Sequence, residues 1–380
     1  MTSSSRTQTL TVTISLLLIC SLAILLPLSP HVSFSERENR ALALFPTLSF
    51  QSLCDGTFSR GLSDFYTDQF PFRTLWLALK AEAERLLGAQ EVGGILLGKE
   101  GYLIPRDEYD DLTVARENLS ACRAFLDLAA ADGNAATVAV VPRAVDVLTS
   151  YLPSLYDPTR AMAVYTPIAQ FLPEAISLVE PLREAANQGA PVWYRTDHHW
   201  TTDGAYLAYT ALAPALDITP TPSEDFTRVT VSSDFLGTSH SASGLLSAQP
   251  DTITLYRYAG DEAMEVYIHE TRTATMGFYH EDQLATKDQY AVFLGGNYAH
   301  LSIRDTANPD KPTLLLFKDS FANALIPFLA RHFQLEIVDL RYLSSSVTPL
   351  LEQIAPDQIL LLLGADTLAT NPSFRKLGMR

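Results

Sequence analysis

The sequence is poor in cysteine. Its 380 residues include three cysteines, Cys20, Cys54 and Cys122, and none of them forms a Cys-x-x-Cys pair or stands at a Cys–His spacing typical of zinc sites. We therefore expect no structural zinc. Cys20 lies in an apolar segment near the N-terminus, so Cys54 and Cys122 form the one pair that could meet in a soluble domain.

Basic charge is scarce as well. The chain has 27 lysines and arginines against 43 aspartates and glutamates, for a formal net charge of −16. A field of that sign repels polyanions, which argues against nucleic acid as a partner and counts mildly against strongly anionic polymers. Repeats and low-complexity linkers are also lacking. With 47% hydrophobic residues, the chain is long enough for one large α/β domain or two smaller ones.

Charge is absent from one long stretch near the N-terminus. The run from Leu10 to Leu28, LTVTISLLLICSLAILLPL, has no charged residue and about the length of a helix that crosses a bilayer. A cleaved signal peptide would have a shorter apolar region and a small-residue cleavage site, whereas this run is followed by SPHVSFSERENR. We predict that residues 1–33 are a membrane anchor or signal segment, with one uncleaved transmembrane helix favoured. Arg6 on the cytoplasmic side would then leave the remaining chain extracytoplasmic, held at the cell membrane by this single pass.

The remainder is predicted to comprise a juxtamembrane segment, residues 34–75, and an α/β domain, residues 76–380. Apolar runs typical of buried parallel strands alternate with helical patterns. The runs are 136–142, 312–317, 335–342 and 358–364, and the helical patterns include 74–87, 113–133, 160–188, 321–333 and 346–354. This alternation predicts a doubly wound, mostly parallel sheet. Several short segments with turn signals predict a strand-rich insertion at about 220–300.

Ser320 occupies the turn at which a buried strand ends and a helix begins, in TLLLFKDSFANALIPFL (313–329). Open α/β sheets bind ligands at the carboxyl ends of their strands, and the first N–H groups of a helix point toward whatever lies there. That position suits a nucleophile beside an oxyanion site. The alternative is an ordinary helix cap, a frequent role for serine at this place. A cap needs no distant acid and histidine, however, whereas a serine nucleophile does.

Such a pair stands in YRTDHHWTTDG (194–204). In extended or loop backbone, residues two apart can project to one side, so Asp197 could accept from Nδ1 of His199 and leave Nε2 free to take a proton from Ser320. His198 would then point elsewhere, to substrate or to structure. A metal site formed by Asp197, His198 and His199 is the weaker interpretation, because neighbouring histidines rarely converge on one ion. We expect no metal and no other cofactor.

The chain resembles a known family through several rare words in a fixed order. YRTDHHWTTDGAYLAY is similar to the defining motif of the DHHW protein family. From about Glu36 to Leu329, the words ENRALALFP, DGTFS, DQFPFR, GKEGYL, DFLGT, FLGGN and KDSFAN occur in the order that family shows. The DHHW proteins in turn resemble the SGNH-hydrolase-like proteins that O-acetylate exported polysaccharides such as alginate. The resemblance implies an SGNH-hydrolase-like form of the doubly wound α/β fold.

The resemblance also implies catalytic roles. Because Trp200 fixes the register, Asp197 and His199 fall on the acid and the base of that family, and Ser320 falls on the nucleophile. Lys318 stands where the nucleophile block of the SGNH enzymes has glycine, which is a departure from their pattern.

Oxyanion or substrate-binding roles follow for four further residues. Gly296 and Asn297, in the word GGN, would be the counterparts of the SGNH oxyanion glycine and asparagine, although the same residues also read as a turn at a strand end. Trp200 and His198 are candidates for substrate contact.

These expectations combine into one functional hypothesis: an extracytoplasmic, membrane-anchored serine acyl-transfer enzyme that O-acetylates a cell-surface or exported polysaccharide. Two alternatives remain open. The same triad could serve a polysaccharide acetylesterase or deacetylase, or the chain could be a non-catalytic glycan-binding surface protein with Trp193, Trp200 and tyrosines as stacking platforms. A single helix cannot carry an acyl donor across a membrane, so a transferase would need a multi-spanning membrane partner as acyl donor.

Overall fold

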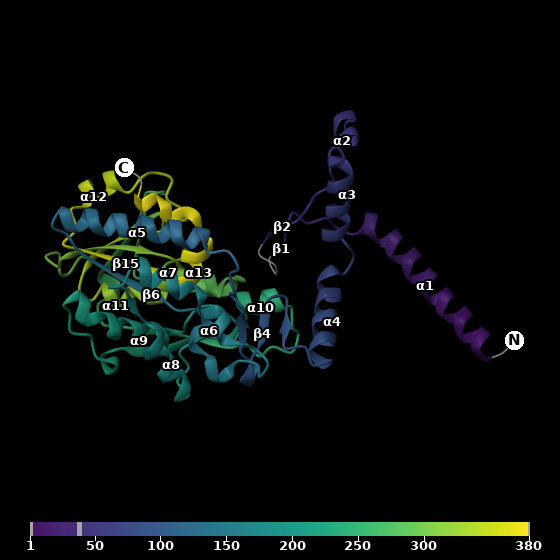
Figure 1. Cartoon of the computed structure of the whole chain (residues 1–380), viewed down its shortest axis with the longest axis horizontal. Helices are drawn as coiled ribbons and strands as arrows, with labels where there is room; N and C mark the ends of the chain where they lie inside the picture. Colours follow the sequence, from purple (N-terminus) through teal and green to yellow (C-terminus); the bar gives the residue numbers. More distant parts are fainter. Residues whose placement is uncertain (1–2, 36–39, 379–380) are drawn as a thin grey trace. The chain divides into compact units, whose positions relative to one another are not determined.

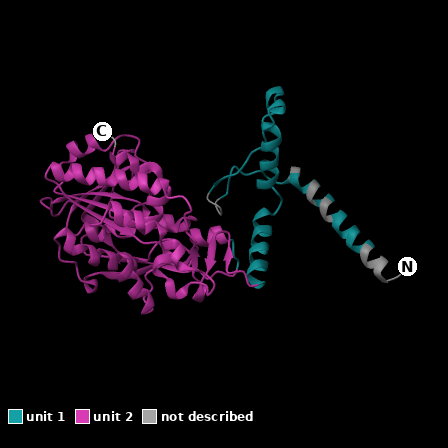
Figure 2. Ribbon diagram, in the orientation of Figure 1, with its two compact units in different colours: residues 1–87, 244–246 teal, residues 88–243, 247–380 magenta. Residues whose placement is uncertain are grey.

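The computed structural model describes residues 3–35 and 40–378. The chain divides into two compact units (Figure 2). One comprises residues 1–87 with 244–246, and the other comprises residues 88–243 with 247–380. Every residue singled out for the candidate site belongs to the second unit, so the first is described briefly.

The N-terminal unit is mainly helical. The side chain of Gln69 bonds the backbone of Val32 and Ala43, which holds the segment after the first helix against the end of the third. Among the described residues, no helix is both long enough and apolar enough to cross a bilayer. The elements of this unit are α1 (Ser3–Leu28), β1 (Phe34–Ser35), β2 (Arg40–Ala41), α2 (Phe50–Cys54), α3 (Thr57–Asp68) and α4 (Arg73–Leu86).

An eight-stranded mixed sheet forms the centre of the second unit (Figure 1). Its strands run in the order β11-β10-β12-β14-β13-β15-β6-β7, and the five from β14 to β7 pair in parallel, whereas β11, β10 and β12 join antiparallel. The strands are β6 (Ala135–Val141), β7 (Ile176–Ser177), β10 (Met264–Ile268), β11 (Thr273–Met276), β12 (His300–Asp305), β13 (Thr313–Lys318), β14 (Gln334–Val338) and β15 (Gln358–Gly364). The fold is therefore mixed α/β around a large, partly parallel sheet.

Helices cover both faces of this sheet, as Figure 1 shows for α5 and α9. Helix α5 buries Leu119, Phe125 and Leu126 in the hydrophobic cluster on one face, and α9 buries Tyr209 and Leu212 in the cluster on the other. The central strands are apolar on both sides because both faces are covered. The helices are α5 (Thr113–Ala131), α6 (Ala144–Val147), α7 (Tyr165–Phe171), α8 (Val179–Asn187), α9 (Thr202–Leu212), α10 (Thr238–Ser243), α11 (Ile326–Leu329), α12 (Thr348–Ile354) and α13 (Ala365–Thr370).

The region at 220–300 is rich in strands, but part of it extends the central sheet. Strands β8 (Thr227–Phe235) and β9 (Asp251–Arg257) form a separate antiparallel pair. Strands β10 and β11 instead pair onto the antiparallel edge through β12. A third small sheet contains β3 (Glu91–Val92), β4 (Ile95–Leu97) and β5 (Leu103–Pro105).

Three predicted elements are wrong in length or continuity. The helix predicted at 160–188 is broken after α7, where Pro173 cannot continue it, and β7 intervenes before α8. The helix predicted at 321–333 is a 3₁₀ helix, η9 (Ser320–Ala324), followed by the single turn of α11. The strand predicted at 335–342 ends at Val338, because the Asp339 side chain accepts from the Arg341 N–H in a turn. All three cysteines are free thiols.

Candidate active site

The candidate residues lie on loops at the carboxyl edge of the parallel strands. Strand β13 ends at Lys318, and after Asp319 the 3₁₀ helix η9 begins at Ser320. Asp197 and His199 lie in the loop between α8 and α9. Parallel strands all end at one edge of a sheet, so side chains from loops far apart in the sequence can meet there.

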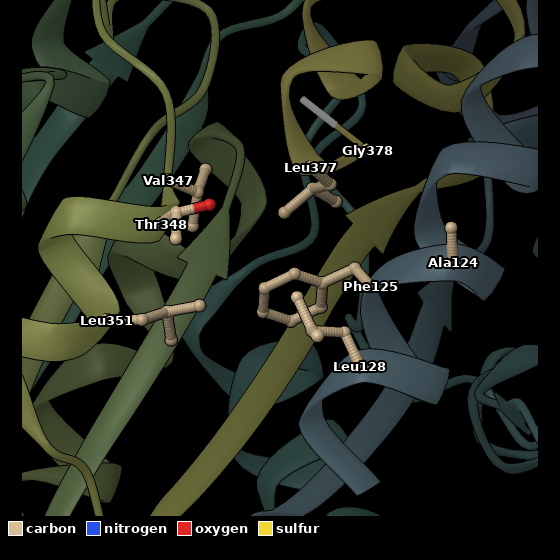
Figure 3. Close-up of a pocket in the computed structure, with 8 residues that line it drawn as sticks. All are labelled: Ala124, Phe125, Leu128, Val347, Thr348, Leu351, Leu377 and Gly378. Carbon is tan, nitrogen blue, oxygen red and sulfur yellow. The ribbon is translucent and has the colours of Figure 1, made fainter. Parts of the chain in front are cut away.

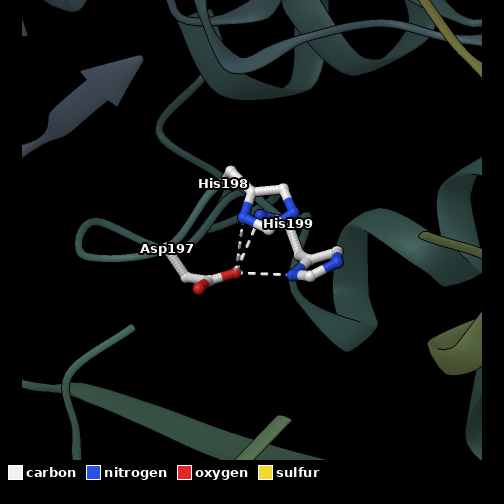
Figure 4. Close-up of side chains that lie close together, drawn as sticks. All are labelled: Asp197, His198 and His199. Carbon is white, nitrogen blue, oxygen red and sulfur yellow. Dashed lines mark hydrogen bonds and ion pairs between the residues drawn. The ribbon is translucent and has the colours of Figure 1, made fainter. Parts of the chain in front are cut away.

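Ser320, His199 and Asp197 form a continuous hydrogen-bonded relay. Nε2 of His199 lies 2.8 Å from Oγ of Ser320, and Nδ1 lies 2.6 Å from Oδ1 of Asp197. Figure 4 shows the second of these contacts. His199 and Asp197 are buried, with 5% and 2% of their surface exposed, whereas Ser320 is half-buried. The relay thus runs from a buried carboxylate to a partly accessible hydroxyl, which suits an acid, base and nucleophile in series.

Asp197 is fixed by a neighbouring loop. Its Oδ2 accepts from the Thr238 N–H at 2.7 Å and from the Thr238 hydroxyl at 2.9 Å. Gly237 permits this close approach, because a Cβ there would lie 2.3 Å from Oδ2 of Asp197. Burial acts to raise the pKa of Asp197, but the neighbouring His199 and His198 and the hydrogen bonds hold that pKa well below its usual range. The carboxylate is therefore ionised.

His199 is neutral at pH 7. Burial and the neighbouring His198 lower the pKa of His199 to about 4, although the carboxylate of Asp197 opposes the shift. The Tyr290 ring stacks on the imidazole with ring centroids 3.9 Å apart and an angle of 8° between the planes. Tyr290 also donates its hydroxyl to the carbonyl oxygen of Ser320 at 3.3 Å. A neutral imidazole held in one orientation can accept the serine proton at neutral pH.

Asp319, and not Ser320, caps the helix that follows β13. Oδ1 of Asp319 accepts from the Phe321 N–H at 3.1 Å, and Oδ2 accepts from the Gly364 N–H at 2.7 Å and the Thr367 hydroxyl at 2.8 Å. The interpretation of Ser320 as an ordinary cap is therefore wrong. Because Asp319 performs that task, the Ser320 hydroxyl is left to bond His199.

Trp200 links the loop that carries Asp197 and His199 to the turn that carries Ser320. Its indole N–H donates to the carbonyl oxygen of Phe321 at 2.9 Å, while the indole of Trp193 donates to the carbonyl oxygen of His198 at 3.0 Å. Both rings are buried, with 0% and 2% exposed. Neither tryptophan can serve as a stacking platform for a glycan, and Trp200 does not contact substrate from this position.

His198 bonds Thr238, and His199 is the histidine that bonds Ser320. Nδ1 of His198 lies 2.6 Å from the Thr238 hydroxyl, and about a third of its side chain, 32%, is exposed. A metal at Asp197, His198 and His199 would have to displace these contacts, since both ring nitrogens of His199 already have partners. The three side chains in Figure 4 fit a proton relay better than a ligand set.

A second histidine–carboxylate cluster joins His269, just after β10, to β12 and β14. Nε2 of His300 is 2.6 Å from Oε2 of Glu336, and the His269 ring stacks on that of His300 at 3.6 Å. The guanidinium of Arg304 already pairs with the other oxygen of Glu336. It supplies the positive charge that a metal would bring, so this cluster reads as a structural ion-pair network.

Gly296 and Asn297 form a turn that reaches the nucleophile loop. Gly296 has a φ of +126°, which favours glycine. Oδ1 of Asn297 accepts from Lys318 Nζ at 2.7 Å and from Asn323 Nδ2 at 3.2 Å. The turn interpretation and the oxyanion interpretation are thus compatible, because the turn places Asn297 beside the segment that carries Ser320.

Sequence reasoning missed several contributors. Thr238 and Gly237 lie in DFLGT, one of the family words, but nothing in that word indicates a bond to Asp197. Tyr290 lies in no recognisable motif. A cavity of about 80 Å³ between α5 and α12 (Figure 3) contains none of the candidate residues. Its lining includes Phe125, Leu128 and Leu351, so it is a gap in apolar packing.

Comparison with known proteins supports the resemblance drawn from the sequence. Residues 175–338 match the model of the DHHW protein family, which confirms the similarity to that family. The match includes the Asp197–His199 loop and Ser320, and therefore the whole relay.

Among curated proteins, the chain is similar to "Probable alginate O-acetylase AlgJ" of Pseudomonas putida, with 28% identity over 188 residues, and to the protein of the same name from Pseudomonas fluorescens, with 27% identity over 185 residues. Each alignment covers 46% of this chain and 47% of the relative. The chain thus spans about half the length of the curated relatives it matches.

Among solved structures, a DHHW family protein from Eubacterium siraeum superposes with a TM-score of 0.63 at 22% identity, over 75% of this chain and 95% of that chain. PatB1 of Bacillus cereus superposes with a TM-score of 0.61 at 19% identity, over 73% of this chain and 98% of that chain. At these identities the likeness establishes a shared fold.

Proposed function

We propose that the protein is a serine acyl-transfer enzyme that O-acetylates a cell-surface or exported polysaccharide, with Ser320 as its nucleophile. The relay from Asp197 through His199 to Ser320 is the observation that carries the proposal. A structural hydrogen bond would not require an ionised buried carboxylate, a neutral imidazole and a partly accessible hydroxyl in series. The O-acetylase names of the curated relatives support acetyl as the transferred group.

The first half of the reaction loads the enzyme. Oγ of Ser320 attacks the carbonyl carbon of an acyl donor while Nε2 of His199 removes the hydroxyl proton, and Asp197 stabilises the imidazolium that forms. Collapse of the tetrahedral intermediate breaks the bond to the donor. The imidazolium returns its proton to the leaving group, and the acyl group remains as an ester on Ser320.

The second half transfers the acyl group. His199 removes a proton from a sugar hydroxyl, whose oxygen attacks the ester carbonyl of Ser320. The new tetrahedral intermediate expels the serine oxygen, which takes the proton back from His199. An O-acyl sugar and free Ser320 result, and water in place of the sugar would give hydrolysis by the same steps.

Three donors are proposed for the oxyanion. They are the N–H of Ser320, the N–H of Gly296 and the side-chain amide of Asn297, and none of them has a hydrogen-bond partner within the described part of the chain. The N–H of Phe321 is not available, because it donates to Asp319. Such donors act by stabilising the charge that develops on the carbonyl oxygen.

Location and partner are further parts of the proposal. The uncharged run from Leu10 to Leu28 supports an extracytoplasmic, membrane-associated enzyme, and a multi-spanning membrane protein is proposed to supply the acyl donor. Fractionation of cells that express the full chain checks the location. Recovery of the protein in the soluble cytoplasmic fraction would contradict it.

Acyl transfer from p-nitrophenyl acetate to oligosaccharides tests the function. Purified full-length protein is incubated with neutral or alginate oligosaccharides, and mass spectrometry measures the gain of acetyl groups while p-nitrophenol release measures turnover. We expect sugar acetylation that Ser320→Ala and His199→Ala abolish. The exposed Ser233→Ala variant on β8 is a matched control and should retain full activity.

The outcomes separate the alternatives. Turnover that depends on Ser320 and leaves every sugar unmodified would select an esterase. No turnover in the wild type with a range of donors would contradict acyl chemistry and favour a glycan-binding protein.

A further inference from the structure

Lys318 is a fully buried lysine two residues from the nucleophile. It ends β13, between the neighbouring strands β14 and β15, and 0% of its surface is exposed. Lysine is almost never fully buried unless its charge is paired and hydrogen-bonded. The relay described above does not use this side chain, so its burial beside Ser320 needs another explanation.

The ammonium group of Lys318 contacts three acceptors. Nζ donates to Oδ1 of Asn297 at 2.7 Å and to Oδ1 of Asn323 at 2.8 Å, and it lies 3.5 Å from Oδ2 of Asp339. Asp339 is also paired with Arg341 at 2.6 Å. Asp339 therefore has a second cation, whereas Lys318 is the one donor to the Asn323 oxygen among the described residues.

These contacts fix which end of the Asn297 amide faces Lys318. An ammonium only donates hydrogen bonds, so the oxygen of Asn297 must face Lys318. Asn323 reinforces this orientation, because its Nδ2 donates to the same oxygen at 3.2 Å. The Nδ2 of Asn297 then points away from both, and no hydrogen bond within the described chain occupies it.

We propose that Lys318 is a positioning residue that holds the amide of Asn297 with its N–H₂ group directed at the oxyanion formed on Ser320. This inference rests on the proposed acyl-transfer function. It also gives a role to the residue that replaces the glycine of the SGNH nucleophile block. A glycine at position 318 has no side chain that could orient the Asn297 amide. If that amide were flipped, its oxygen would face the oxyanion and repel it.

The lysine is held at a cost to stability. Burial lowers the pKa of Lys318 to about 8, although the carboxylates of Asp339 and Asp319 oppose the shift and Arg341 adds to it. Replacing a whole buried ion pair by apolar side chains is often neutral or stabilising, whereas removing one partner alone leaves the other buried and unpaired. Burial of this charge therefore costs folding free energy, which its contacts with Asn297, Asn323 and Asp339 offset in part.

Lys318→Met tests the proposal on the full-length protein. We expect kcat for acyl transfer to fall by about 10²-fold, the usual effect of losing one oxyanion donor, with KM within about threefold. The Tm should also fall, because Asn323 and Asp339 lose a buried partner. Lys376→Met is the matched control, because Lys376 donates to the backbone oxygens of Leu340 and Leu343 and should leave kcat unchanged.

The double variant Lys318→Met/Asn297→Ala tests whether Lys318 affects kcat through Asn297. If Lys318 acts through Asn297, the double variant should be no slower than Asn297→Ala alone. Loss factors that multiply, or a Lys318→Met enzyme within twofold of wild type, would overturn the inference. Should Lys318→Met not fold, Lys318→Gln keeps an N–H donor without charge and should retain intermediate activity. A fully inactive, folded Lys318→Gln enzyme would count against positioning through that donor.

The pH profile gives a readout that a purely structural role would not move. The kcat of wild type should decline as pH rises through about 8, where Lys318 loses its proton, and Lys318→Met should lack this decline. Failure of the proposed function remains distinguishable, because it would leave the wild type itself without turnover. Failure of this inference would leave an active wild type and an equally active Lys318→Met enzyme.

Discussion

The indole of Trp200 donates to the carbonyl oxygen of Phe321 at 2.9 Å, and this bond ties the loop of Asp197 and His199 to the turn of Ser320. The two segments are 121 residues apart in the chain. The 2.8 Å contact between His199 and Ser320 therefore depends on a hydrogen bond outside the relay.

Trp200→Phe should slow the reaction without changing any reacting group. We expect kcat to fall about tenfold, because a small displacement of the base from the nucleophile is costly. Unfolding free energy should fall by about 2 kcal/mol, from the lost hydrogen bond and a small cavity. Steady-state kinetics and thermal denaturation measure the two effects.

Trp193→Phe is the matched control for that change. The lost volume is the same and the lost hydrogen bond goes to His198, so stability should fall similarly. A kcat lowered equally in both variants would show that general packing, and not the bond to Phe321, positions the relay.

Activity should depend on pH through His199. The base must be neutral, and burial with His198 places its pKa at about 4, so kcat/KM should be constant near pH 7 and fall as pH drops through about 4. Asp197→Asn should lower kcat by about 10³- to 10⁴-fold across this range, since the imidazolium loses its carboxylate. A profile that rises with a midpoint near 6.5 would contradict a buried, neutral histidine.

Gly237→Ala should damage the support of Asp197. A Cβ at this position would lie 2.3 Å from Oδ2 and 2.4 Å from Cβ of Asp197, so the loop has to move and the bonds from Thr238 weaken. We expect a loss of about 2 kcal/mol of stability together with lower kcat, measured by denaturant unfolding and steady-state kinetics.

Thr238→Val provides the comparison for Gly237→Ala. It removes the hydroxyl contact with Asp197 and keeps the backbone N–H contact at 2.7 Å, so its effect on kcat should be smaller. Wild-type stability and activity in Gly237→Ala would refute the close packing of this loop against the carboxylate.

The sequence predicts the strands and the reacting side chains better than it predicts how the strands pair and which residues support the site. The apolar runs at 312–317 and 358–364 form buried strands because covered parallel strands are apolar on both faces. The spacing of Asp197 and His199 limits which of the two histidines can share a face with the acid. The local sequence pattern is therefore sufficient to predict these strands and the residues of the candidate relay.

The pairing of the strands and the contacts that hold the relay in place arise between segments far apart in the sequence. A local sequence pattern does not encode such contacts. Nothing in MEVYI (264–268) indicates that it joins the central sheet antiparallel beside β12. The stacking of Tyr290 on His199 likewise links residues about 90 positions apart. By contrast, the break at Pro173 could have been predicted, because proline cannot continue a helix.

Labelling of Ser320 by a sulfonyl fluoride is the most direct test of the central claim that this serine is an activated nucleophile. Full-length protein is treated with phenylmethylsulfonyl fluoride, and peptide mass spectrometry locates the adduct. We predict one adduct on Ser320 in the wild type and its loss in His199→Ala. An unlabelled Ser320, or equal labelling in both proteins, would contradict the account.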